Sequence, residues 1–98
     1  MITELASFAV MADRAQEFEK EFVAAAGLVR AAPGALAVSL LRCAERPGDY
    51  VFVVDWERIE DHTERFAHSA EFQQFASVLG RYLVEGPRAE HFQKVFGL

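Results

Sequence analysis

The sequence predicts an α+β domain of the ferredoxin-like type, an antiparallel sheet with its helices on one face. Extended and helical segments follow one another in the order β-α-β-β-α-β, the second helical region being broken in two. The chain has 98 residues without a Ser-, Gly- or Pro-rich linker, and 52% of its residues are apolar. This length suffices for one hydrophobic core and hardly for two, so residues 1–98 are expected to form a single domain.

The first two predicted elements are a strand and the clearest helix of the chain. Residues 2–11 are mostly apolar, which favours a strand covered on at least one face, and Asp13 is the expected N-cap of the following helix. The helix places apolar residues at three- and four-residue spacing opposite a charged face: Ala15, Phe18, Phe22, Ala25 and Val29. Pro33 and Gly34 end it.

A hairpin and a short helix are expected next. Residues 35–43 and 50–56 are β-rich, and the segment between them contains the turn pair Pro47-Gly48. Trp56 ends the second strand, and an acidic turn then opens a helix that runs to about residue 67. Glu60 and Asp61 are expected at its surface, near the helix N-terminus that favours negative charge.

The last helix and strand complete the predicted fold. Ser69 is placed to cap a helix in which Phe72, Phe75 and Tyr82 recur at helical spacing, and Gly86-Pro87 is expected to end it. Residues 89–96 alternate in polarity, as in a closing strand.

The helices would leave one face of this sheet uncovered. Exposing its apolar side chains to water costs about 25 cal/mol per Å². Two sheets packed face to face in a homodimer would remove that cost, so we expect a homodimer.

Composition and charge exclude several classes of partner. The formal net charge is -5 and the basic residues are scattered, which disfavours nucleic acid and anionic membranes. The longest apolar run, residues 23–29, is too short to cross a bilayer, and the N-terminal segment lacks the basic region of a signal peptide. Cys43 is the single cysteine, which fits a reducing compartment. A cytoplasmic protein is expected.

One histidine is a candidate for chemistry. Ile59, His62 and Phe66 lie at positions i, i+3 and i+7 of the short helix, so they share a face and direct His62 toward the interior. An imidazole titrates near neutrality and is therefore suited to exchange protons inside an apolar cavity.

The sequence after the hairpin forms a longer pattern that resembles a known family. Its members are Trp56-Glu57, Ile59-Glu60-Asp61-His62, Phe66, Ser69, Glu71-Phe72, Phe75, Leu79, Tyr82-Leu83 and Glu90-His91-Phe92. Together with the hairpin LLRCAERPGDYVFVVDWE, this pattern resembles the antibiotic biosynthesis monooxygenase (ABM) family. The resemblance implies a dimeric α+β barrel with a pocket between the sheet and the second helical region. It also implies one of several activities, including cofactor-independent oxygenation of anthrones and quinols, haem degradation and isomerisation of a sugar.

These observations favour a cofactor-independent monooxygenase acting on a small aromatic molecule such as an anthrone, phenol or quinol. His62 is the candidate base, because such a substrate supplies its own electrons and needs only to lose a proton. The expected substrate-binding residues are an aromatic wall and one polar contact or proton relay: Trp56, Phe66, Phe72, Tyr82 and His91. No nucleotide-binding motif is present, and no cofactor is expected.

Other interpretations remain open. His62 is also compatible with a structural role, the more common one for a histidine on an apolar face, in a non-catalytic dimeric domain that binds a hydrophobic metabolite. Haem is disfavoured, because the haem-degrading branch uses an Asn, which this chain lacks, and a His at the position where Phe66 stands. A metal site is not expected, since the histidines His62, His68 and His91 lack metal-binding spacing.

Overall fold

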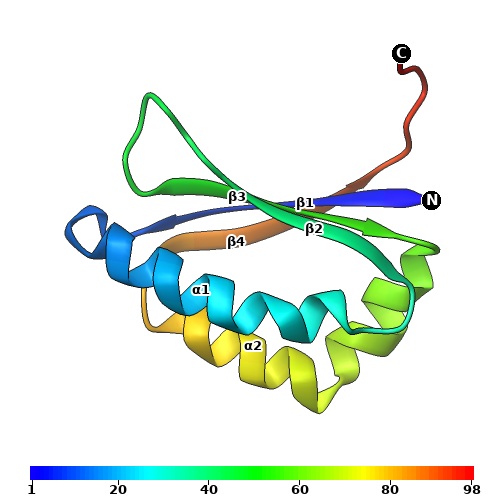
Figure 1. Ribbon diagram of the computed structural model, residues 1–98, viewed down its shortest axis with the longest axis horizontal. Helices are drawn as coiled ribbons and strands as arrows, with labels where there is room; N and C mark the ends of the chain where they lie inside the picture. The colour runs from blue at the N-terminus through cyan, green and yellow to red at the C-terminus, as the bar shows by residue number, and fades with distance from the viewer.

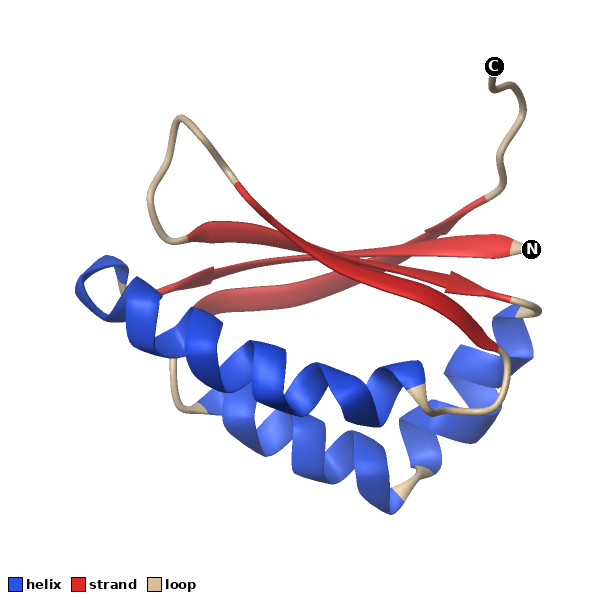
Figure 2. Ribbon diagram, viewed as in Figure 1, coloured by secondary structure: helices blue, strands red, loops and turns tan.

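The computed structural model describes residues 1–98 as one four-stranded antiparallel sheet with its helices on one face (Figure 1). The strands are β1 (Ile2–Val10), β2 (Ala35–Arg42), β3 (Asp49–Trp56) and β4 (Leu83–Phe92), and the long helices are α1 (Ala15–Arg30) and α2 (Ala70–Gly80). Their spatial order is β2-β3-β1-β4, with every neighbouring pair antiparallel. Figure 2 shows both helices on the same side of the strands. The predicted ferredoxin-like α+β fold is confirmed.

The core lies between the sheet and the helices and is mainly aromatic. The predicted inner face of α1 is confirmed, since Phe18, Phe22, Ala25 and Val29 are all buried. Phe22 joins the layers: its ring centroid lies 4.9 Å from that of Phe52 on β3 and 5.3 Å from that of Phe75 on α2. The same helices therefore define both the core and any cavity beneath them.

Two helix ends differ from the sequence prediction. Asp13 does not cap α1, because it lies in a 3-10 turn and α1 begins at Ala15 with no side-chain cap. α2 ends at Gly80, well before Gly86-Pro87, although Ser69 does cap its start by accepting a hydrogen bond from the Phe72 amide at 3.0 Å.

The closing strand begins and ends earlier than predicted. β4 spans Leu83–Phe92 and contains Gly86-Pro87, whereas residues 89–96 were expected. Gly86 has a φ of 87°, and a Cβ there would lie 2.8 Å from the Ser7 carbonyl oxygen. A glycine therefore lets β4 continue along β1 through an irregularity in the register after Ser7.

The segment between β3 and α2 is not a regular α-helix. It contains a π-helical turn at Asp61–Arg65 and a 3-10 turn at Phe66–His68. The wider turn keeps His62 partly buried and Phe66 buried but leaves Ile59 37% exposed, so the expected common face of these three residues is wrong.

The predicted surface position of Asp61 is also wrong, since it is only 3% exposed. Its carboxylate accepts a hydrogen bond from the Arg58 amide at 3.2 Å and lies 3.7 and 3.5 Å from the guanidinium groups of Arg58 and Arg65. Gly34 packs against it, and a Cβ at Gly34 would lie 2.2 Å from Asp61 Oδ2. Asp61 therefore holds the turn together from inside.

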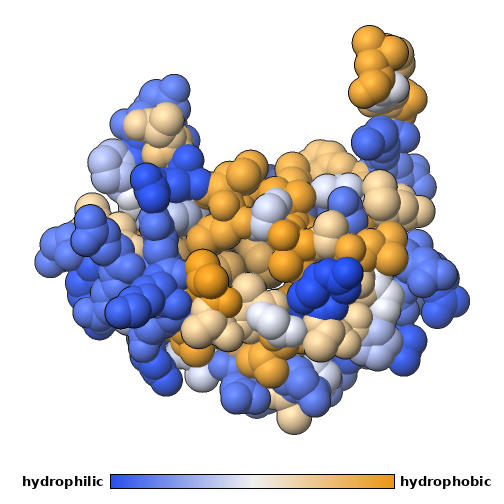
Figure 3. Space-filling model, viewed as in Figure 1, coloured by the Kyte–Doolittle hydropathy of each residue, from blue (hydrophilic) through white to orange (hydrophobic).

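The other face of the sheet carries no helix. Alternation along the strands turns Leu5, Leu41, Val51 and Val53 to this side, and Leu41 is 55% exposed. Figure 3 shows apolar surface over the strands, between the polar β2–β3 loop and the projecting C-terminal segment. Neither helix is both long and apolar enough to span a membrane.

Candidate functional site

A cavity of about 310 Å³ lies on the helix-covered side of the sheet, beside α2. Most of its lining is apolar, and its aromatic members are Phe8, Phe22, Phe52, Phe66, Phe72 and Phe75. Glu4 and His62 are its only polar lining residues. An apolar cavity with one polar corner is typical of a binding site for a small apolar molecule that carries one polar group.

Glu4 reaches this corner because of its place on β1. Strand alternation puts Glu4 on the same face as Ala6, Phe8 and Val10. Glu4 is only 7% exposed. Trp56 Nε1 donates a hydrogen bond to Glu4 Oε1 at 2.9 Å. Burial raises the pKa of Glu4, an effect that the Trp56 hydrogen bond and the nearby His91 partly offset.

The His62 ring is held between an indole and a second imidazole. It stacks on Trp56 with 5.4 Å between ring centroids and 10° between ring planes. Its Nδ1 lies 2.7 Å from Nε2 of His91 and 3.5 Å from Oε1 of Glu4. Burial, and secondarily the charge of His91, lowers the pKa of His62 to about 4, so the ring is neutral at pH 7.

His91 stands behind His62 rather than on the cavity wall. β4 pairs His91 directly with Glu4 of β1, which puts both side chains on the helix-covered face. No protein group pairs with His91 Nδ1, and this nitrogen is not fully buried. The imidazole pair thus runs from the cavity to the surface.

The predicted site residues divide into two groups. Phe66 and Phe72 line the cavity together with His62, and the two phenyl rings form a T-shaped pair 5.6 Å apart. Trp56 is fully buried behind His62 and lies off the cavity wall, so it contacts the site through the His62 ring, the Phe66 ring and the Glu4 carboxylate.

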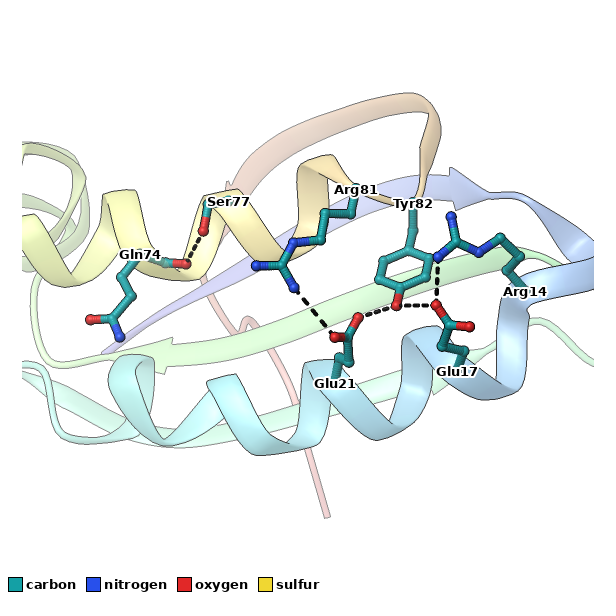
Figure 4. A network of polar contacts seen from close by, with 7 residues as sticks. All are labelled: Arg14, Glu17, Glu21, Gln74, Ser77, Arg81 and Tyr82. Carbon is teal, nitrogen blue, oxygen red and sulfur yellow. Dashed lines mark hydrogen bonds and ion pairs between the residues drawn. The ribbon is translucent and has the colours of Figure 1, made fainter.

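Tyr82 was expected in the aromatic wall, and the structure places it elsewhere. Its hydroxyl lies between the carboxylates of Glu17 and Glu21 on α1, with which it forms hydrogen bonds (Figure 4). The helix ends before Tyr82, and its ring packs on Phe18 with 5.6 Å between centroids. Tyr82 therefore joins α1 to the start of β4 and does not line the cavity.

Sequence reasoning missed Glu4 as a site residue. The signal was present, because Glu4 interrupts the apolar even-numbered positions of β1. A carboxylate on the inner face of a strand needs a partner or a function. The corner it forms with His62 can receive a proton from a hydroxyl held among the phenyl rings. No three His, Cys, Asp or Glu side chains of the chain converge as metal ligands would.

Comparison with known proteins supports this description of the site's scaffold. The family model for antibiotic biosynthesis monooxygenase matches residues 1–78. The uncharacterized protein YczJ of Bacillus subtilis is 38% identical over 95 residues, which cover 97% of this chain and 100% of YczJ.

Solved structures of similar proteins share this fold. A protein from Bordetella bronchiseptica, named for the same family, superposes with a TM-score of 0.92 at 38% identity, covering 97% of each chain. SnoaB of Streptomyces nogalater, a cofactor-independent oxygenase, superposes with a TM-score of 0.84 at 22% identity, covering 99% of this chain and 95% of SnoaB. The SnoaB likeness extends to the fold alone.

Proposed function

Since the chain belongs to the antibiotic biosynthesis monooxygenase family, we propose that it is a cofactor-independent monooxygenase of a small aromatic molecule with an acidic C–H or O–H group. One observation carries the proposal: a neutral histidine, His62, stands at the polar corner of a cavity otherwise walled by phenyl rings. An anthrone, phenol or quinol has the matching chemistry, a flat apolar body with one proton to lose.

The proposed reaction begins when His62 Nε2, which has no protein partner, takes a proton from the substrate. The resulting anion transfers electrons to O₂, and a C–O bond forms to give a hydroperoxide. For an anthrone, the CH₂ carbon becomes a carbonyl, the O–O bond breaks, and the second oxygen leaves as water. Substrate and O₂ supply all the electrons and atoms, so the proposed activity uses no cofactor.

Oxygen consumption with an anthrone or a quinol tests the proposal. His62→Ala is expected to lower turnover by about 10²-fold or more, the usual contribution of a positioned base. The matched control is His68→Ala, since His68 is exposed and lies outside the cavity. Turnover in His62→Ala equal to that of the unaltered protein would remove His62 as the base.

One observation also favours a second function, a non-catalytic domain that binds a hydrophobic metabolite. His62 Nδ1 already has a hydrogen-bond partner, and a group with a pKa of about 4 is a weak base at pH 7. Binding of the aromatic probe by fluorescence quenching, without oxygen consumption in any condition, would select this function over the first.

We further propose that the protein is a cytoplasmic homodimer. The apolar outer face of the sheet supports the dimer, because it includes exposed Leu41 and Phe92 and has no helix over it. The lone Cys43 supports a reducing compartment. Sedimentation at micromolar concentration is expected to give the mass of two chains. Leu41→Lys, which puts a charge on the apolar face, is expected to shift the measured mass toward that of one chain. A folded monomer of the unaltered chain would refute the dimer.

A further inference from the structure

We propose that His62 and His91, with Glu4 beside them, form a proton relay that connects the cavity to solvent at the edge strand β4. The inference rests on the proposed function, in which His62 takes the proton of a bound molecule. It adds a route for that proton and assigns His91 as a positioning residue that acts through His62.

The distance between the two imidazoles defines the relay. With 2.7 Å between His62 Nδ1 and His91 Nε2, a single hydrogen occupies the space between the nitrogens. When that hydrogen is on His62 Nδ1, its Nε2 is unprotonated and able to act as a base. This is the tautomer that the relay requires at rest.

Proton transfer through the pair then balances. As His62 Nε2 gains the substrate proton, the Nδ1 proton passes to His91 Nε2, and His91 releases its own Nδ1 proton to water. One proton enters and one leaves, with no net charge left on the pair. The same steps in reverse return a proton through His62 when the second oxygen of O₂ leaves as water.

The surroundings favour this path. Glu4 on β1 is the one acidic residue within ion-pair distance of the imidazole pair, with its Oε1 3.5 Å from His62 Nδ1. The cavity residues that α2 contributes are apolar, and on the segment carrying His62 the charges of Asp61 and Arg65 face each other. β4 is an edge strand, and His91 Nδ1 has no protein partner and is not fully buried, so water can reach the outer end of the pair.

Nitrogen-15 NMR of the histidine rings tests the relay without any turnover. At pH 7 we expect His62 as the Nδ1–H tautomer and His91 with an unprotonated Nε2. We also expect Glu4→Gln to lower the apparent pKa of the imidazole pair, because a negative charge that favours the added proton is removed. An Nε2–H tautomer of His62 at rest would overturn the relay, whether or not the protein is an oxygenase.

Enzyme kinetics with the anthrone probe provide a second test of the relay. In His91→Gln the amide oxygen still accepts the His62 Nδ1 hydrogen bond but cannot carry a proton, so we expect kcat to fall at least about tenfold with KM unchanged. Added imidazole is expected to restore turnover in His91→Ala, a rescue that a structural role would not show. His68→Gln is the matched control.

The two tests separate the hypotheses. If His62→Ala abolishes turnover while His91→Gln retains the rate and pH profile of the unaltered protein, the relay fails and the proposed function stands. If the unaltered protein consumes no oxygen, the proposed function fails and the ring tautomers alone decide whether the relay exists.

Discussion

Two polar clusters differ in how their charges are balanced, one between α1 and the start of β4 and the other at the polar corner of the cavity. At one end the Tyr82 hydroxyl shares its one hydrogen between Glu17 and Glu21, and each carboxylate also contacts an arginine, Arg14 or Arg81 (Figure 4). At the other end Glu4, His62 and His91 meet with no arginine or lysine among them. The first cluster is a closed network, whereas the second has ring nitrogens left without protein partners.

This difference shows in the direction of the pKa shifts. The Tyr82 hydroxyl and, secondarily, Arg14 lower the pKa of Glu17, so this carboxylate is held in its ionised form. Burial acts in the opposite sense on the second cluster, raising the pKa of Glu4 and lowering that of His62 to about 4, so each is driven toward its neutral form. Groups held against their ordinary charge are common at functional sites, and salt-bridged networks are more often structural.

The largest effect on stability is expected from acidification of the second cluster. His62 has a folded pKa of about 4 against an ordinary 6.5, so its contribution is present above pH 6.5 and is lost as the pH falls from 6.5 to 4. The loss has an upper limit of about 3 kcal/mol in the free energy of unfolding. Glu4 opposes it, because its raised pKa favours the folded state on acidification. Urea unfolding at pH 7 and pH 4.5 measures the combined effect of His62 and Glu4 on the free energy of unfolding.

His62→Gln removes the titrating ring and is expected to flatten this pH dependence. Tyr82→Phe serves as the matched comparison from the closed cluster, since it is expected to leave the loss between pH 6.5 and about 5 unchanged, above the range in which Glu17 titrates. Equal slopes in His62→Gln and the unaltered protein would show that the His62 ring is not held neutral by burial.

A smaller effect of opposite sign is expected from Glu4→Gln. The amide still accepts the Trp56 hydrogen bond but carries no charge, so the variant should be more stable at pH 8 by about 1 kcal/mol. The raised pKa sets the window: the gain is absent below pH 4.5 and grows as the pH rises through the folded pKa of Glu4. Glu64→Gln, at an exposed position, is the control. A destabilised Glu4→Gln at pH 8 would mean that the carboxylate is favourably paired as an ion.

Local patterns were sufficient to predict several elements of the fold and part of the cavity wall. The buried face of α1, the hairpin, the Ser69 cap and the presence of Phe66 and Phe72 beside His62 follow from spacing within a few residues. The open cluster depends on longer-range geometry. Glu4 and His91 meet only through the register of β1 and β4, at opposite ends of the chain.

The turn that carries His62 also could not be predicted from residue spacing, for a different reason. A π-helical turn changes the rotation per residue, so the spacing of a regular helix wrongly placed Ile59 inside. Asp61 was expected at the surface as a charge near a helix N-terminus, and it is buried instead. Tyr82 was misplaced because a helical period was continued past Gly80, where α2 ends. In both places the backbone hydrogen-bond pattern, which no residue spacing reveals, decides where the side chain points.

The smallest effect on activity is expected from Tyr82→Phe, which sharpens the contrast between the clusters. The change leaves Glu17 and Glu21 without the phenol between them, so the melting temperature should fall as the two carboxylates come under mutual repulsion. Turnover per folded molecule should stay within about twofold, because Tyr82 lies outside the cavity and its partners do not touch His62. Oxygen consumption measured well below the melting temperature checks this. A large loss of kcat with an intact fold would show that the closed cluster is coupled to the site, and the division drawn between structural and functional polar groups would then be wrong for this protein.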